Sequence, residues 1–184
     1  IARALGLPLV IKARGSDIHH WGAEPGALGQ MLNAANRAAA LLAVSEGLRR
    51  DMIALGMPAS RIAVHYTGLD RARFHPVERS EARARIASIL PIPTGGPLLV
   101  TPGALIAIKG QRLAIESLTA LPSAQLALAG TGPDEAGLRD LAETLGLAER
   151  VHILGQVGHD ILPLLLSAAD VMVLPSMREG LANA

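Results

Sequence analysis

Short apolar runs alternate with amphipathic, helix-forming segments along most of the chain. In its first part, the apolar runs predict buried strands at residues 8–13, 41–45 and 61–68. The amphipathic segments between them predict helices at residues 27–40 and 46–56. Ser45 can cap the second of these helices, and Gly56 can end it. The polar segment RGSDIHHWG, residues 14–22, is expected to be a loop.

A regular strand–helix rhythm returns after residue 96. The pattern predicts strands at residues 98–103, 125–130, 151–155 and 171–174, and helices at residues 110–121, 135–147 and 160–169. Apolar strands that alternate with helices favour parallel pairing and right-handed crossovers. We therefore expect these four strands to form one parallel sheet, separate from the sheet that contains residues 41–45.

The segment between the two halves is charged and punctuated by prolines, with a helical middle. It indicates a domain boundary near residues 74–96. The sequence thus predicts the α/β class, with two Rossmann-like parallel-sheet domains. The expected division is residues 1–70 for the first domain, 71–96 for a linker with a first helix, and 97–184 for the second domain.

Composition narrows the function classes. Half of the 184 residues are hydrophobic but only 2% are aromatic, so the core must be aliphatic. Seventeen basic and sixteen acidic residues give a net charge of +1, which argues against a nucleic-acid partner. The chain has no cysteine, its six histidines lack metal-ligand spacing, and no apolar run could span a bilayer. The first residue is Ile1 and no signal-peptide pattern follows, so we interpret the sequence as part of a cytoplasmic enzyme whose two ends are missing.

The stretch TPGALIAIKGQ, residues 101–111, is the first candidate for chemistry. A strand ends at Gly103, where glycine lets a ligand approach the backbone. Lys109 and Gly110 precede a helix, where a cation and the helix amino end favour phosphate. The spacing is not that of a Walker loop. The alternative is that Gly103 forms a turn and Lys109 is a solvated charge.

Two further stretches follow predicted strands. AGTGPDE, residues 129–135, lacks the dinucleotide-binding spacing and indicates a tight turn with Asp134 near a helix start. VLPSMREGLANA, residues 173–184, delivers Glu179 and Gly180 to the carboxyl end of a strand, where open α/β sheets bind ligands. Glu179 could contact sugar hydroxyls, and the amides from Gly180 onward could receive phosphate at a helix start. The alternative is an acidic residue favoured by the helix dipole alone.

Three long stretches together resemble one family: residues 44–76, residues 100–111, and residues 126–181. The segments TGLDRARFHP and VLPSMREG are the more specific parts. The chain resembles retaining glycosyltransferases of the GT-B fold, the large group 1 class (family four). That fold pairs an acceptor-side domain with a donor domain, each Rossmann-like. The resemblance makes residues 1–70 the end of the acceptor-side domain and residues 97–184 a truncated donor domain.

The resemblance also implies site residues. Glu179 matches the first glutamate of the family's E-x7-E motif, which contacts the donor sugar, and the second glutamate would lie beyond Ala184. Lys109 matches the lysine that binds the donor diphosphate, and Gly103 the glycine before it. Relatives usually carry an arginine directly after that glycine, where this chain has Ala104. The remaining implied residues contact the donor (Arg178, Gly180 and Leu181), the nucleobase (Gly155, Gln156 and Val157) or the cleft of the first domain (Arg14, Gly15 and Asp17).

We therefore interpret the sequence as part of a retaining, metal-independent, hexosyltransferase-type enzyme without a cofactor, inactive as a fragment. It would move a sugar from a nucleoside-diphosphate sugar to a saccharide or lipid-linked saccharide, as in polysaccharide biosynthesis. Peripheral membrane association is one possibility, and self-association through exposed apolar surface is another. The alternatives are a nucleotide-sugar epimerase of the same fold and a nucleotide-binding module without turnover, which Ala104 makes conceivable.

Overall fold

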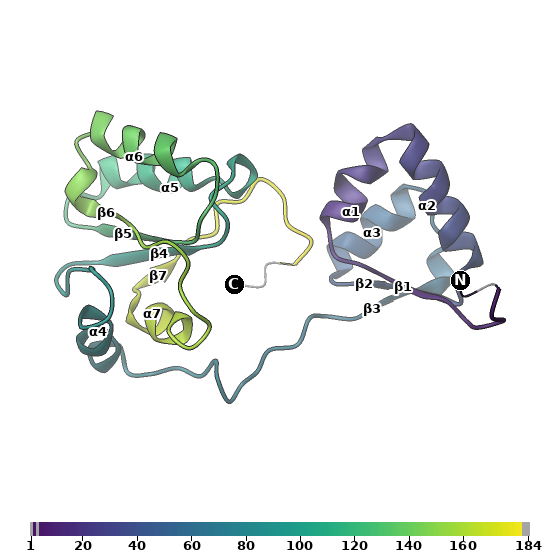
Figure 1. Ribbon diagram of the computed structural model, residues 1–184, viewed down its shortest axis with the longest axis horizontal. Helices are drawn as coiled ribbons and strands as arrows, with labels where there is room; N and C mark the ends of the chain where they lie inside the picture. The colour runs from purple at the N-terminus through teal and green to yellow at the C-terminus, as the bar shows by residue number, and fades with distance from the viewer. Residues whose placement is uncertain (1, 3, 182–184) are drawn as a thin grey trace. The chain divides into compact units, whose positions relative to one another are not determined.

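The computed structural model describes residue 2 and residues 4–181, which divide into two compact units (Figure 1). The first unit runs to Gly68 and also includes Glu179, Gly180 and Leu181. The second unit comprises Leu69–Arg178. Each unit contains one parallel sheet, as the sequence predicts.

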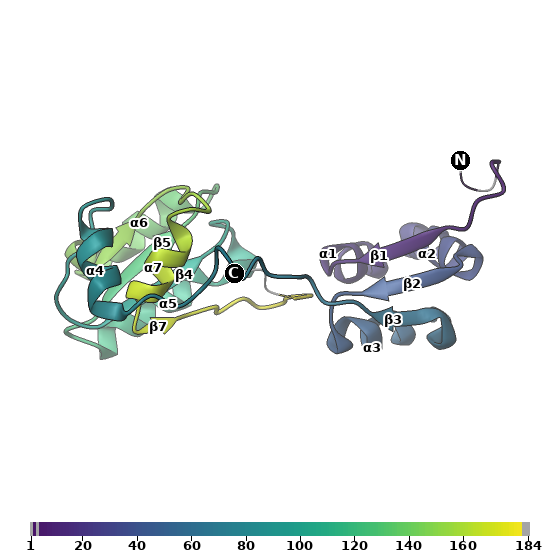
Figure 2. The ribbon, with the colours of Figure 1, turned by 90° about the horizontal axis from the view of Figure 1, so that it is seen from below.

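The first unit holds a three-stranded sheet in the order β1-β2-β3, with strands β1 (Val10–Ala13), β2 (Ala40–Ala43) and β3 (Ile62–Val64). Its helical elements are α1 (Ser16–His19), η1 (Trp21–Ala23), α2 (Pro25–Arg37), α3 (Glu46–Ala54) and η2 (Ala59–Arg61). Figure 1 shows α1, α2 and α3 on one face of this sheet. Figure 2 presents the opposite face, and none of the helices described for this unit lies over it. The unit's buried apolar cluster therefore lies on a single side of the sheet.

The second unit holds a four-stranded parallel sheet in the order β6-β5-β4-β7. The strands are β4 (Leu98–Pro102), β5 (Gln125–Ala129), β6 (Val151–Ile153) and β7 (Val171–Met172). The helices are α4 (Arg79–Ala87), α5 (Gln111–Ser117), α6 (Glu135–Thr144) and α7 (Leu162–Ala168), with the short turns η3 (Ala107–Lys109), η4 (Leu118–Ala120) and η5 (Ala148–Arg150). The prediction that these four strands form one parallel sheet, separate from that of the first unit, is confirmed.

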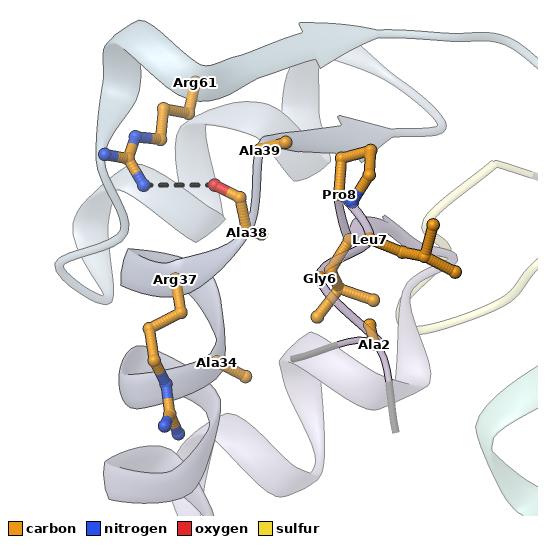
Figure 3. Close-up of a pocket in the computed structure, with 10 residues that line it drawn as sticks. Ala2, Gly6, Leu7, Pro8, Ala34, Arg37, Ala38, Ala39 and Arg61 are labelled. Carbon is orange, nitrogen blue, oxygen red and sulfur yellow. Dashed lines mark hydrogen bonds between the residues drawn. The ribbon is translucent and has the colours of Figure 1, made fainter. Parts of the chain in front are cut away.

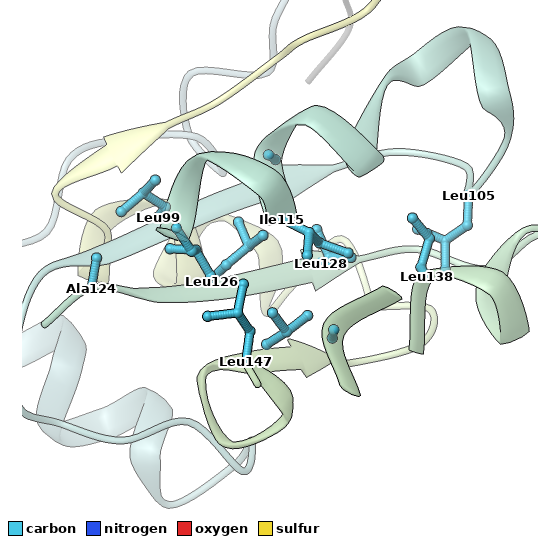
Figure 4. Close-up of a cluster of buried hydrophobic side chains, with 12 residues drawn as sticks. Leu99, Leu105, Ile115, Ala124, Leu126, Leu128, Leu138 and Leu147 are labelled. Atoms are coloured by element: carbon cyan, nitrogen blue, oxygen red, sulfur yellow. The ribbon is translucent and has the colours of Figure 1, made fainter. Parts of the chain in front are cut away.

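Two apolar clusters flank this second sheet. One joins the sheet to α5 and α6 and includes Leu126, Leu128 and Ile115 (Figure 4). The other joins the opposite face to α4 and α7 and includes Val100, Ile86 and Leu165. All five residues of β4 are buried, because helices cover both faces.

Several sequence-based boundaries were wrong. The predicted loop at residues 14–22 contains α1 and η1, because Ile18 is 4% exposed and anchors this short helix in the first core. The helix expected at residues 27–40 begins at Pro25 and ends at Arg37, since Ala40 pairs with Val10 in the sheet. The last predicted strand is only Val171–Met172, followed by an irregular segment.

Candidate functional site

The strand order of the second unit defines where a ligand would bind. The chain moves from β4 outward to β5 and β6, then returns to place β7 on the other side of β4. The order therefore reverses between β4 and β7. In open α/β sheets, ligands bind outside the carboxyl ends of the strands at such a switch point. The segments that leave this point are Gly103–Lys109 after β4 and Val173–Arg178 after β7.

The loop after β4 is held by the turn after β5. The amide of Gly103 donates to the Ala129 carbonyl at 2.9 Å, and the amide of Leu105 donates to the Thr131 carbonyl at 2.9 Å. A Cβ atom on Gly130 would lie 1.9 Å from the Gly103 carbonyl oxygen, and a Cβ on Gly132 would lie 2.2 Å from the Leu105 oxygen. The glycines of AGTGPDE therefore allow close backbone approach. The expected turn is confirmed, with Asp134 at the amino end of α6.

Lys109 and Gly110 lie against the segment that leaves β7. Gly110 has a φ of 69°, and a Cβ there would lie 2.3 Å from the Pro175 carbonyl oxygen. The Met177 amide donates to the Ile108 carbonyl at 2.9 Å. Lys109 is half-buried and lies at the switch point. Its backbone neighbours, Ile108 and Gly110, both contact the segment that leaves β7. Ala104, in the place where relatives usually have an arginine, is exposed.

Gln111 is the residue of this region that the sequence analysis did not single out. Its side chain is 2% exposed, and its Nε2 atom donates to the Ala104 carbonyl at 2.7 Å. A glutamine directly after Lys-Gly, on the buried side of an expected helix, is the only sequence signal for such a contact. The partner in the loop is set by packing, which the sequence does not display.

Gly155, Gln156 and Val157 follow β6 at the same carboxyl edge of the sheet. Strand β5 separates β6 from β4, so these residues lie two strands away from the loop that carries Lys109. Gly155 has a φ of 67°, which suits a glycine turn at the end of the strand. Gln156 is exposed, whereas Val157 packs against the core shared with α7.

Arg14, Gly15, Asp17 and Gly180 lie together at the carboxyl end of β1, in the first unit. The Asp17 carboxylate accepts hydrogen bonds from the amides of Arg14 and Gly15, the latter at 2.7 Å. A Cβ on Gly180 would lie 2.2 Å from the Arg14 carbonyl oxygen, so only glycine fits there. The Ser45 hydroxyl donates to the Gly180 carbonyl at 2.6 Å while it accepts from the Leu48 amide as the cap of α3.

The segment from Arg178 to Leu181 is irregular rather than helical. Leu181 packs against the core of the first unit. The helix start expected after Gly180 lies outside the described residues. The described residues therefore test neither the helix start that would receive a phosphate nor the alternative that Glu179 is an acid in the first turn of a helix.

A hollow in the first unit lies at the opposite edge of the sheet from Arg14, Gly15 and Asp17. It has a volume of about 850 Å³ and is lined by residues that precede the three strands, among them Leu9, Ala39 and Arg61 (Figure 3). The Arg61 guanidinium donates to the carbonyls of Asn36 and Ala38 at the end of α2. Because ligands of parallel sheets bind at carboxyl ends, we assign this hollow no ligand.

A second cavity, of about 320 Å³, lies inside the first unit between η1, α2 and the sheet. Its lining is mostly apolar and includes Ile18, Met31, Met52 and the half-exposed Trp21. Ile18 and Met52 are buried in the core of the first unit, and Met31 packs against it.

Two carboxyl groups of the second unit, those of Asp170 and Glu78, have lowered pKa values. The Leu98 amide and then the Arg83 and Arg79 guanidinium groups lower the pKa of Asp170, although burial opposes them. Bonds from Ser80 and from the Glu81 amide lower the pKa of Glu78 to about 2 at the start of α4. Both groups precede a helix or strand, so their role is structural.

No three histidine, aspartate or glutamate side chains in residue 2 or residues 4–181 lie where they could hold one metal ion. Across the same residues, no helix has the length and apolar character needed to cross a bilayer.

Comparisons with known proteins identify the family. The family model described as "Glycosyl transferases group 1" matches residues 82–184, more than half of the chain. The chain belongs to this family. A second model, "Glycosyltransferase Family 4", matches residues 1–73 of this group 1 chain.

Curated relatives agree with this assignment. The 2-deoxystreptamine N-acetyl-D-glucosaminyltransferase of Streptomyces fradiae is 31% identical over 139 residues, covering 72% of this chain and 33% of that protein. The alpha-D-kanosaminyltransferase of Streptomyces kanamyceticus is 28% identical, covering 98% of this chain and 50% of that protein. This group 1 chain thus spans between a third and a half of these relatives.

Solved structures support the fold. A crystal structure of Anabaena HepE in complex with UDP and glucose matches with a TM-score of 0.80 at 21% identity, covering 95% of this chain and 48% of that chain. Sucrose-phosphate synthase from Thermosynechococcus elongatus matches with a TM-score of 0.78 at 21% identity, over 96% of this chain and 46% of that one. These neighbours are GT-B glycosyltransferases, so the expected fold class is confirmed.

Proposed function

We propose that this chain handles the donor in a transferase that moves a hexosyl group from a nucleoside-diphosphate sugar to a hydroxyl, with retention and without a metal or other cofactor. The observation that carries the proposal is the loop after β4, which presents Lys109 at the switch point of the second sheet. Two facts about similar proteins support it. The HepE structure contains UDP and glucose, and the curated relatives are named for transfer of sugar groups.

Each candidate residue has a chemical task in this proposal. Lys109 stabilises the leaving diphosphate as negative charge develops on it. Glu179 positions the sugar, with Arg178, Gly180 and Leu181 completing the donor contacts. Gln156 and Val157 receive the nucleobase through the turn at Gly155. We assign no side chain as a nucleophile.

The acceptor side of the proposal rests on Arg14, Gly15 and Asp17. The Asp17 carboxylate fixes the backbone that bears the exposed Arg14 guanidinium, at the carboxyl end of β1. We propose a saccharide or lipid-linked saccharide as the acceptor, in a cytoplasmic pathway of polysaccharide synthesis.

Lys109→Ala tests the donor site. Loss of a charge-assisted contact typically costs about 1.5–3 kcal/mol, so we expect nucleoside-diphosphate affinity to fall about ten- to a hundredfold. The matched control is Arg112→Ala, which removes a 68%-exposed cation that pairs with Glu116 on α5 and should leave affinity unchanged. Calorimetry with UDP, ADP, GDP and dTDP measures both. If Lys109→Ala binds as tightly as the wild type, the lysine is a surface charge and the donor assignment is wrong.

Glu179→Gln tests the second role, in the protein expressed from the complete reading frame. It keeps the side-chain shape but alters the grip on the sugar, so diphosphate affinity should remain and transfer should slow. Turnover with the donor measures the transfer rate. Equal loss of diphosphate binding and of turnover would place Glu179 at the diphosphate instead. An elimination product formed without acceptor would favour the epimerase, and binding without any turnover would favour the nucleotide-binding module.

Ala104→Arg tests the same loop by adding a positive charge, whereas Lys109→Ala removes one. Ala104 is exposed, so a longer side chain can be accommodated there. An added guanidinium beside the diphosphate should tighten its binding about tenfold through a charge-assisted contact. Unchanged affinity in Ala104→Arg would mean that this position does not face the phosphates.

A further inference from the structure

Gln111 is one of two polar side chains, with Thr101, that are buried among the described residues. Burying an amide group is costly unless it is hydrogen-bonded. The Gln111 amide is bonded through Nε2 to the Ala104 carbonyl oxygen at 2.7 Å. That carbonyl lies in the loop between β4 and Lys109, seven residues earlier in the chain. The buried amide group of Gln111 is therefore hydrogen-bonded only when the loop places the Ala104 carbonyl against it.

The peptide between Ala104 and Leu105 is held at both of its polar ends. Its carbonyl accepts from Gln111 Nε2 and from the Ile106 amide at 3.0 Å. Its amide, on Leu105, donates to the Thr131 carbonyl at 2.9 Å. Because a trans peptide is planar and its C=O and N–H groups point in opposite directions, these bonds fix the orientation of the plane.

This orientation decides what the loop presents to a ligand. With the Ala104 carbonyl turned inward to Gln111, the Ala104 side chain is exposed and Leu105 is fully buried. Without the bond from Gln111, the Ala104 carbonyl would keep only the bond from the Ile106 amide at 3.0 Å. It could then turn outward and present a partial negative charge where the diphosphate is proposed to lie.

We propose that Gln111 is a positioning residue for the diphosphate loop, holding the Ala104 carbonyl away from the donor phosphates. This inference rests on the proposed function of the same loop. Gln111 does not itself touch the donor. It acts through the Ala104–Leu105 peptide, so its loss affects contacts to the terminal phosphate and not the rest of the nucleotide.

Two variants separate positioning from packing. Gln111→Met keeps the length of the side chain and removes its hydrogen-bond donor. Gln111→Glu keeps the shape but sets a carboxylate against the Ala104 carbonyl oxygen. The matched control is Gln125→Met, because Gln125 hydrogen-bonds His152 at 2.8 Å from the amino end of β5, at the opposite edge of the sheet.

Calorimetry on the whole chain compares UDP, ADP, GDP and dTDP, followed by the monophosphate of whichever diphosphate binds most tightly. We expect Gln111→Met to weaken the diphosphate about three- to tenfold, the typical value of one hydrogen bond. Gln111→Glu should weaken it more than tenfold. The monophosphate should change less than twofold in both variants, and Gln125→Met should change neither ligand. Thermal denaturation of each variant reports the packing effect separately.

Three outcomes decide between the proposals. If Gln111→Met and Gln125→Met lower Tm alike and both keep diphosphate affinity within twofold, Gln111 is only a packing residue. Equal weakening of the monophosphate and the diphosphate would also overturn the positioning role. In both cases, a loss of diphosphate affinity in Lys109→Ala leaves the proposed function standing. A wild-type chain that binds none of the four diphosphates overturns the proposed function, and the role of Gln111 with it.

Discussion

The two parallel sheets differ in how many of their faces are covered. In the first unit, β1 alternates between exposed and buried positions, with Val10 54% exposed and Ala13 2% exposed. In the second unit, β4 is buried at all five positions. Parallel sheets usually have both faces covered, and among the described residues only the second sheet has helices of its own unit on both faces. Strand β4 (LLVTP) has no charged residue, whereas β1 carries Lys12 on its open face.

This difference indicates where stability and where adaptability lie. Among the described residues, the second unit has two apolar clusters, one on each face of its sheet, and the first unit has one. Buried apolar area is the main favourable term in folding. We therefore expect the second unit to be the more stable of the two, and its candidate loops to rest on a rigid base. The following substitutions test that comparison.

The largest effect is expected from a glycine in each unit. Gly130→Ala in the second unit would place a Cβ 1.9 Å from the Gly103 carbonyl oxygen and should cost about 3 kcal/mol through backbone strain. Gly29→Ala lies in α2 of the first unit with no atom within 4 Å of the added carbon. It should stabilise that unit by about 0.5–1 kcal/mol, because alanine is the better helix former. Urea denaturation followed by circular dichroism measures both, and a neutral Gly130→Ala would show that the loop is free to move.

The second-largest change in the free energy of unfolding is expected when a valine in each sheet is replaced by alanine. Val100 in β4 is completely buried, so Val100→Ala should cost about 2 kcal/mol through lost burial and a residual cavity. Val10 in β1 is 54% exposed, so Val10→Ala should change the free energy of unfolding by less than about 0.5 kcal/mol. Similar losses at the two positions would mean that the open face of the first sheet is covered in solution.

Asp170→Asn should weaken the second unit by about 1–2 kcal/mol at pH 7, since hydrogen bonds to charged groups contribute more than neutral ones. The carboxylate accepts from the Leu98 amide at 2.7 Å and pairs with Arg79 and Arg83 of α4. The fold lowers the pKa of Asp170, so its contribution is present above the ordinary value of 3.8 and is lost as the pH falls below it. Denaturation at pH 7 and pH 3 should therefore show a smaller difference between variant and wild type in acid.

The smallest effect concerns His152 in β6. Burial lowers its pKa from the ordinary value of 6.5, and Glu149 partly opposes this shift. The neutral form is therefore favoured in the folded state, and stability should decline slightly as the pH falls from 7 to 5. His152→Gln should reduce this pH dependence, which denaturation at several pH values would detect. An unchanged slope would assign the decline to other groups.

Much of this fold could be predicted from residue patterns. The four strands of the second unit lie within short apolar runs, so the pattern predicted that they exist and share one parallel sheet. The predicted end of α2 was wrong. Ala38, Ala39 and Ala40 favour helix by propensity, but Ala40 pairs with Val10 of β1 in the sheet. The short helix α1 has too few residues for a periodic signal, and it depends on the burial of Ile18.

The candidate site also contains residues that the sequence predicted and one, Gln111, that it did not. Gly103 and Lys109 could be chosen from the sequence alone, because glycine allows a ligand close to the backbone and lysine supplies a charge for phosphate. Gln111 does not, because its partner is a backbone carbonyl that any sequence supplies. The proximity of Gly180 to Arg14 also depends on tertiary structure, since the two residues are far apart in the chain.

The half-exposed Trp21 at the rim of the apolar cavity has a spectroscopic consequence. It is the only tryptophan of the sequence, and it lies in η1 of the first unit. Intrinsic fluorescence excited at the red edge of the absorption band therefore reports on that unit alone, while far-ultraviolet dichroism sums over both. Recording the two signals during one denaturation would resolve the unfolding of each unit without any added label.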